Sequence, residues 1–205
     1  MSTETSAKKQ EQKSSTRVMV GVAMLAAVAI VLQYLEFPIP MIIPDFIKFD
    51  LSDLPALIGA FAYGPIAGVL IELVKNLIHC AASKSFTVGE LSNFILGAAF
   101  TFTAGLIYAR KKSKKSALIG GIVGAIIMGL ISFPSNLYVV YPFYYNFFPE
   151  EAVLGAYRVI MPGVKNVTQC LLIFNLPFTI VKGLISVVIT MFIYKPLSHI
   201  LKGNK

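Results

Sequence analysis

The sequence predicts an all-α integral membrane protein, a bundle of six transmembrane helices with both termini in the cytoplasm. Its 205 residues are 56% hydrophobic and 14% charged, and the mean hydropathy is +0.74. A soluble domain has about 45–50% apolar and about 25% charged residues, so this composition excludes a soluble protein. The net charge of +8 does not indicate nucleic-acid binding, because most basic residues flank apolar spans in segments 8–17, 110–115 and 195–205. Such flanking is typical of cytoplasmic loops.

The first element is an apolar helix at about residues 17–35, long enough to cross a bilayer. Residues 1–16 are polar and predict a disordered cytoplasmic tail. Within the helix, Ala23 and Ala27 are four residues apart and form a smooth strip that another helix can approach closely. The strip either packs inside the protein's own bundle or docks a partner.

The second element, residues 36–50, is apolar but rich in proline. Pro38, Pro40 and Pro44 prevent a regular helix. An apolar, irregular segment of this kind predicts a lid folded over a site.

The following thirty residues predict two short helices, at about 51–63 and 65–80, that turn at Gly64-Pro65. A single helix here would place the basic segment 110–115 on the opposite side of the membrane from the N-terminus. Two helices bring all three basic segments to the cytoplasm, so the sequence favours two.

The second of these helices has a polar stripe. Glu72, Lys75, Asn76 and His79 are spaced i, i+3, i+4 and i+7, which places them on one face. Charges at membrane depth are costly and indicate a functional site by default. The alternative is structural: Glu72 and Lys75 neutralise each other and stabilise helix packing.

Three further spans are predicted at about 88–109, 117–140 and 170–194, followed by a basic tail at 196–205. The last span has a second polar stripe of Asn175, Thr179 and Lys182 at i, i+4 and i+7. Lys182 lies too deep to reach water, so it needs either a ligand or an internal acceptor, for which Glu72, Glu90 and Asp53 are the candidates.

The polar groups lie toward the outer half of the bundle, beneath the proline-rich segment and an aromatic loop at 141–169. This arrangement predicts a pocket for a flat or partly apolar solute. No nucleotide, catalytic or metal motif is present, so a binding protein without cofactor or metal is expected rather than an enzyme. A small membrane enzyme acting on lipid head groups, with Glu72, Glu90 and His79 as acid–base groups, is the alternative from a different class.

Four blocks carry a family resemblance: KFDLSDLPALIGAFAYGPIAGVLIELVKNLIH (48–79), VGELSNFILG (88–97), SNLYVVYPFY (135–144) and NLPFTIVKG (175–183). They resemble the substrate-binding (S) components of energy-coupling factor (ECF) vitamin transporters, most closely the riboflavin-specific ones. The resemblance implies a multi-pass protein of the bacterial plasma membrane that captures riboflavin outside with high affinity. It also implies delivery inward with a transmembrane coupling protein and two ABC-type ATPases.

The resemblance also assigns residues. Asn136 and Lys182 become candidates to bind the flavin ring or ribityl chain, and Gly89 and Gly97 would let the ring approach the fourth span. Thr179 stands where riboflavin-binding members often have asparagine, which leaves an S component for another vitamin or precursor as the alternative. Ala23 and Ala27 match the strip that docks the coupling protein. The other predicted substrate-binding residues are Asn175, Asn93, Glu90, Asn76, Asp53 and Phe46.

Overall fold

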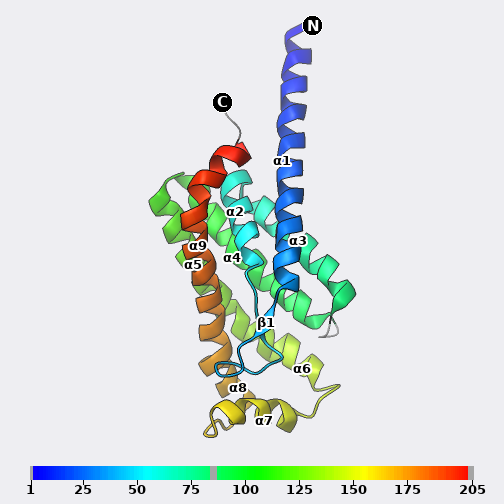
Figure 1. The fold of residues 1–205 in the computed structure, drawn as a ribbon, viewed down its shortest axis with the longest axis vertical. Helices are drawn as coiled ribbons and strands as arrows, with labels where there is room; N and C mark the ends of the chain where they lie inside the picture. Colours follow the sequence, from blue (N-terminus) through cyan, green and yellow to red (C-terminus); the bar gives the residue numbers. More distant parts are fainter. Residues whose placement is uncertain (1, 84–86, 203–205) are drawn as a thin grey trace.

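The computed structural model describes residues 2–83 and 87–202, and most of them are helical (Figure 1). The long helices are α1 (Ser2–Tyr34), α3 (Pro65–His79), α4 (Val88–Arg110), α5 (Lys114–Ser135) and α9 (Leu176–Lys202). In the described part, five helical segments are long and apolar enough to cross a membrane: 15–34, 65–82, 88–110, 114–144 and 167–193. The predicted helical membrane protein is therefore confirmed.

The helix α2 (Asp53–Tyr63) is apolar but has only 11 residues. It is separated from α3 by Gly64, whose φ of 105° lies in the region that L side chains rarely adopt. Pro65 then opens α3, a position where its missing N–H costs nothing. The chain thus turns at Gly64-Pro65, where the sequence predicts a turn between two helices.

At both ends of the chain, helices extend into the segments predicted as a disordered N-terminal tail (1–16) and a basic C-terminal tail (196–205). α1 begins at Ser2, so residues 2–16 continue the first span as helix, and lysine, glutamine and glutamate in this stretch are good helix formers. α9 continues to Lys202, with Pro196 inside it. Residues 203–205 of the predicted basic tail lie outside the described residues, as do residues 84–86 of the loop between α3 and α4.

The bundle packs through small residues. α4 packs extensively against α5 and α3, and α5 packs against α9. At Gly120 and Gly124 an added Cβ would come within 2.8 and 2.7 Å of the α4 carbonyl oxygens of Ala104 and Phe100. Only glycine permits this contact, so α5 lies directly on the backbone of α4.

Both termini lie at one end of the bundle, and the opposite end is capped by irregular and short helical segments (Figure 1). The outer hairpin segment (residues 35–52) is irregular, as predicted, apart from a two-residue antiparallel ladder between β1 (Phe37–Pro38) and β2 (Lys48–Phe49). It is followed at this end by α6 (Tyr141–Tyr144), α7 (Glu150–Ile160) and α8 (Val167–Cys170).

The predicted loop at 141–169 is therefore partly helical, which corrects the sequence interpretation. α7 buries Val153, Leu154 and Tyr157 and exposes Glu150 and Glu151. The buried residues of α7 have helical spacing. However, the helix has only 11 residues and lies between prolines, so the helical periodicity is hard to recognise in the sequence.

Candidate functional site

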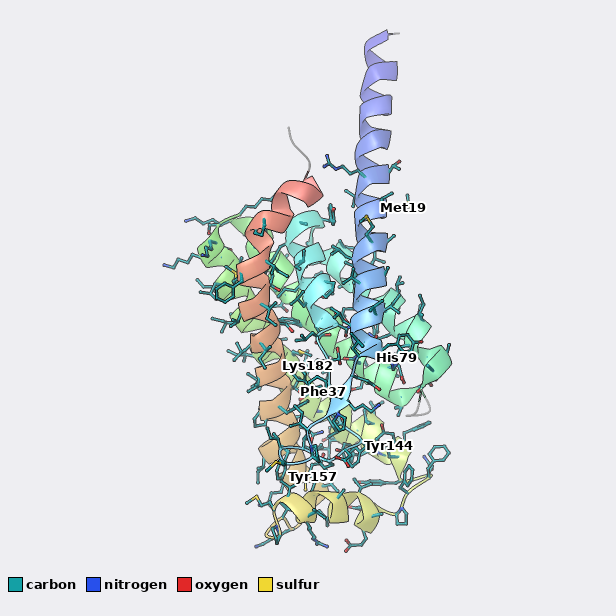
Figure 2. All side chains as sticks on the ribbon, viewed as in Figure 1. Met19, Phe37, His79, Tyr144, Tyr157 and Lys182 are labelled. Carbon is teal, nitrogen blue, oxygen red and sulfur yellow. The ribbon has the colours of Figure 1, made fainter. Side chains whose placement is uncertain are left out.

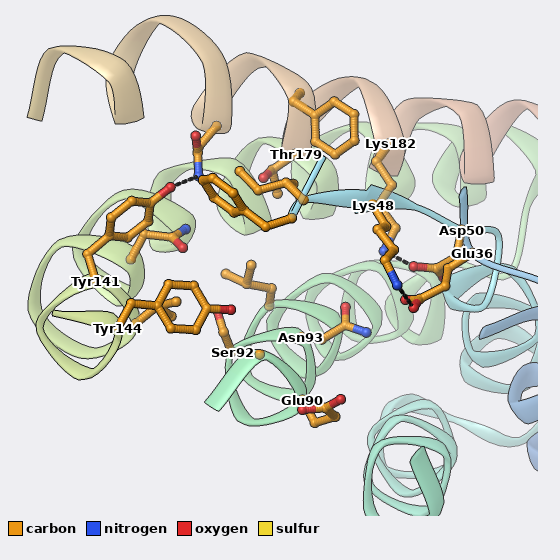
Figure 3. A pocket seen from close by; sticks show the side chains of 18 of the residues that line it. Glu36, Lys48, Asp50, Glu90, Ser92, Asn93, Tyr141, Tyr144, Thr179 and Lys182 are labelled. Atoms are coloured by element: carbon orange, nitrogen blue, oxygen red, sulfur yellow. Dashed lines mark hydrogen bonds and ion pairs between the residues drawn. The ribbon is translucent and has the colours of Figure 1, made fainter. Parts of the chain in front are cut away.

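The described residues line a cavity of about 620 Å³ (Figure 3), to which α7 contributes Ala152, Val153 and Ala156. Its volume lies within the range of about 300–1,000 Å³ that is usual for small-molecule sites. The end of α1, the outer hairpin segment, α4, α5, α7 and α9 all contribute side chains. The outer hairpin segment supplies Phe46, Ile47, Lys48 and Asp50, so it forms one wall of the cavity.

The lining changes character from one side to the other. Tyr141 and Tyr144 lie on one side, and Glu36, Lys48, Asp50 and Lys182 lie on the other (Figure 3). The further aromatic lining residues are Phe46, Phe148 and Phe178. The cavity therefore suits a solute with a flat aromatic part and a polar part.

Eight of the ten predicted substrate-binding residues line this cavity: Phe46, Gly89, Glu90, Asn93, Asn136, Asn175, Thr179 and Lys182. Asn76 does not, because its side chain accepts from Gln33 Nε2 at 3.1 Å and donates to the Glu72 carbonyl at 2.9 Å. Asp53 is fully buried away from the cavity surface. Helical spacing identifies the inward face of a helix, but that face can meet a neighbouring helix instead of a cavity.

Lys182 lies at the cavity wall and is also held by carboxylates. Its Nζ donates to Asp50 Oδ2 at 2.9 Å and lies 3.3 Å from Asp53 Oδ2. An ammonium has three donor hydrogens. The bond to Asp50 uses one of them, whereas Asp53 Oδ2 lies within ion-pair distance but accepts no hydrogen bond from the described residues, so donor hydrogens remain for a ligand. The salt bridge to Asp53, one of the internal acceptors considered from the sequence, is present together with one to Asp50.

A second lysine extends this network away from the cavity. Lys75 Nζ contacts Asp53 at 2.6 Å, Ser52 at 2.7 Å and Glu72 at 2.8 Å. Lys75 and Glu72 do not line the cavity, so the structure favours the interpretation in which their charges stabilise packing.

Gly97 belongs to the same structural cluster and corrects one prediction. It does not line the cavity, and an added Cβ would collide with the Glu72 carboxylate. Its role is to make room for that side chain, rather than for the ring of a ligand.

Two π-helical turns bring asparagines to the cavity. η2 (Asn136–Val140) begins at Asn136, and η3 (Leu171–Asn175) ends at Asn175. π turns inside helices frequently occur at functional sites. Asn136 Nδ2 donates to the Ser132 carbonyl at 2.7 Å, while Asn175 hydrogen-bonds Tyr141 and Tyr157. Burial raises the pKa of the Tyr157 phenol, so Tyr157 keeps its proton as a donor.

Sequence analysis missed several lining residues, including Gln33, Glu36, Lys48, Asp50, Ser92, Tyr141 and Tyr144. Lys48 pairs with Glu36, and His79 Nδ1 lies 3.0 Å from Glu90 Oε1. Together with the Lys182–Asp50 pair, every basic residue that lines the cavity in the described part of the chain is thus matched with a carboxylate. Asp50 carried a signal in the sequence, because a charge in an apolar segment indicates a functional site. Lys48, Ser92, Tyr141 and Tyr144 lie inside the family blocks, but nothing else in the sequence singled them out.

On α1, Ala23 and Ala27 are exposed, whereas Leu25, Ala26 and Ala29 are buried. The predicted strip therefore faces outward from the bundle, which leaves it available to a partner.

A helical membrane bundle with an amphipathic cavity beneath an outer hairpin defines a membrane-embedded solute-binding protein. Residues 17–194 match the family of ECF transporter substrate-specific components, and the chain belongs to this family. It is therefore a multi-pass transporter subunit of the cell membrane, and the enzyme alternative is wrong.

Individual relatives agree with this assignment. The riboflavin transporter RibU of Staphylococcus aureus (strain TCH60) is 34% identical over 184 residues, covering 90% of this chain and 92% of that protein. The riboflavin transporter FmnP of Bacillus subtilis (strain 168) is 29% identical over 181 residues, covering 86% and 89%. A solved structure of the S component of a bacterial ECF transporter superposes with a TM-score of 0.71 at 33% identity, covering 92% of this chain and 99% of that one.

Proposed function

We propose that this chain is the riboflavin-binding subunit of an ATP-driven ECF importer, which captures the vitamin at the extracellular side. The observation that carries the proposal is the two-sided cavity of about 620 Å³. Its aromatic side suits the flat three-ring system of a flavin, and its polar side suits a ribityl chain. The relatives named as riboflavin transporters support the same ligand.

The hydrogen-bond partners inside the cavity agree with a flavin. Asn136 uses its amide N–H on the Ser132 carbonyl, so its Oδ1 is left as an acceptor. Lys182 has donor hydrogens that the bond to Asp50 does not use, as described above. The pyrimidine edge of a flavin has an N–H between two carbonyl oxygens, so it can satisfy an acceptor and a donor at once.

The membrane topology proposed here has six crossings with cytoplasmic termini. Both termini lie at the same end of the bundle (Figure 1), which requires an even number of crossings. α2 rises only about 16 Å at 1.5 Å per residue, about half of the hydrocarbon core. The outer hairpin segment completes this crossing, and the turn between α4 and α5 carries the exposed basic residues Arg110–Lys115 expected in the cytoplasm.

The proposed partners are a transmembrane coupling protein and two ABC-type ATPases, which supply the energy. Riboflavin is the transported ligand and not a cofactor. The outward-facing Ala23 and Ala27 support α1 as the docking helix, because small side chains let helices approach closely in a membrane.

A vitamin panel tests this proposal. The purified protein is heated with riboflavin, thiamine, biotin or pantothenate, and its melting temperature is measured. Riboflavin alone should raise that temperature, since a ligand that binds only the folded state stabilises it. Stabilisation by a different vitamin, with no response to riboflavin, would contradict the proposal and keep only the S-component family.

A further inference from the structure

Three side chains close to α7 form a ring of hydrogen bonds beside the cavity. The Tyr157 hydroxyl donates to Asn175 Oδ1 at 2.6 Å, and Asn175 Nδ2 donates to the Tyr141 oxygen at 3.3 Å. The two tyrosine hydroxyls also hydrogen-bond each other. Because Tyr157 gives its only proton to Asn175, Tyr141 is the donor in that bond. The ring is closed, with each member donating once and accepting once.

The ring is shielded from water and joins three elements. Tyr157 is 0% exposed, Tyr141 2% and Asn175 5%, so bulk water does not compete for these bonds. Tyr157 comes from α7, Tyr141 from α6 and Asn175 from the π turn before α9. Figure 2 shows Tyr157 at the α7 end of the bundle, on the outer side of Lys182.

The ring orients the Asn175 amide. A separation of 2.6 Å suits O–H···O, whereas N–H···O bonds are usually near 2.9–3.0 Å, so the carbonyl oxygen faces Tyr157. Tyr141 lines the cavity and Tyr157 does not. The amide oxygen is thus committed to Tyr157, outside the lining, whereas the nitrogen faces the lining residue Tyr141 and keeps one hydrogen unused.

We propose that Tyr157 is a specificity-determining residue for the bound vitamin. It positions the Asn175 amide so that the cavity presents an N–H donor to a carbonyl oxygen of the ligand. This inference rests on the proposed function, and it adds a residue of the outer helix α7 that does not line the cavity. Asn136, with its free Oδ1, presents the opposite polarity, so the two amides together select an edge that carries both a carbonyl and an N–H.

Removing the Tyr157 hydroxyl should free the amide to turn over. With phenylalanine at 157, only Tyr141 remains, and a hydroxyl can donate to the amide oxygen as readily as accept from its nitrogen. The cavity would then present either a donor or an acceptor at Asn175. The expected loss is therefore selectivity for the ligand carbonyl, and not only affinity.

The test compares riboflavin with its 2-thio and 4-thio analogues, in which a weaker sulfur acceptor replaces one carbonyl oxygen. Dissociation constants are measured for the full-length wild type, Tyr157→Phe, and the control Tyr145→Phe. Tyr145 packs against Tyr141 with 6.5 Å between ring centroids but does not line the cavity. The wild type should prefer riboflavin over one thio analogue by about three- to tenfold, the size of one neutral hydrogen bond.

Tyr157→Phe should bring that preference close to one, while Tyr145→Phe keeps it. A preference that Tyr157→Phe retains would overturn the proposal. If Tyr157→Phe fails to fold, Asn175→Leu removes the donor without changing α7 and must abolish the same preference; its persistence overturns the proposal equally. Wild-type protein that binds no flavin would instead contradict the proposed function, so the two failures are distinguishable.

Discussion

Replacing Lys75 by methionine should destabilise the fold severely, because its ammonium is the centre of a buried network. It contacts Asp53, Ser52 and Glu72 at 2.6, 2.7 and 2.8 Å. The side chains of Lys75, Asp53 and Glu72 are 0% exposed. Methionine has a similar length but no charge, so Glu72 would lose its cation and Asp53 would keep only Lys182, at 3.3 Å.

The expected magnitude follows from this loss of partners. Removing one partner of a buried ion pair costs about 3–5 kcal/mol. Glu72→Gln is the matched change: it removes one of three buried carboxylates that share two ammonium groups, and the amide keeps the shape. We expect it to cost about 1 kcal/mol or less, the value of one net hydrogen bond. In the double variant no carboxylate is left at position 72, so it should be more stable than Lys75→Met alone.

The assay is reversible unfolding of the purified protein in mixed micelles, followed by circular dichroism. The free energy of unfolding is compared for the wild type, both single variants and the double variant. The reasoning is refuted if Lys75→Met costs no more than Glu72→Gln, or if the two single effects simply add, because additivity would mean that the two groups do not interact.

Four further outcomes are expected. Lys182→Met should weaken riboflavin binding about tenfold to a hundredfold, the worth of a charge-assisted hydrogen bond; an unchanged dissociation constant would make this lysine structural. Ala27→Trp should leave riboflavin binding intact but weaken pull-down of the coupling protein, whereas Leu130→Trp, on the exposed face of α5, should leave both riboflavin binding and pull-down intact. Phosphorylated riboflavin should bind at least about tenfold more weakly in equilibrium titration, because among the described residues each basic side chain of the lining is already paired with a carboxylate. Gly97→Ala should lower the free energy of unfolding by about 1–3 kcal/mol through its collision with the carboxylate beside it, while Gly155→Ala, which meets nothing within 4 Å, should be neutral or slightly stabilising.

The spans were predictable from the sequence because apolar length and flanking charge are local properties. The break at Gly64-Pro65 followed from charge on distant segments, and the structure has it there. The polar stripe with Asn175, Thr179 and Lys182 lines the cavity as expected, because the last span has one polar face and that face meets the site.

Other features depended on which helices and segments pack against each other, and the periodicity of a sequence does not reveal those neighbours. Asp53 and Asn76 are polar residues that point into the bundle, as Lys182 does, yet their side chains contact neighbouring helices and not the cavity. Asp50 became part of the site only because the outer hairpin segment returns to α9, 132 residues further along the chain. The π turns at Asn136 and Asn175 differ from α-helix by one hydrogen-bond register, and each is followed two residues after its end by a proline, Pro142 or Pro177. A proline removes the i→i−4 bond and its ring clashes with the carbonyl of residue i−4, so it marks a disturbed turn but does not show which side chain that turn brings to the cavity.

The most direct test of the account is a titration of riboflavin with the detergent-purified protein, followed by quenching of flavin fluorescence. If riboflavin is the ligand of this cavity, quenching should saturate at one flavin per chain, with a submicromolar dissociation constant that weakens in Lys182→Met. Fluorescence that the protein leaves unchanged at micromolar concentration would contradict riboflavin as the ligand of this cavity.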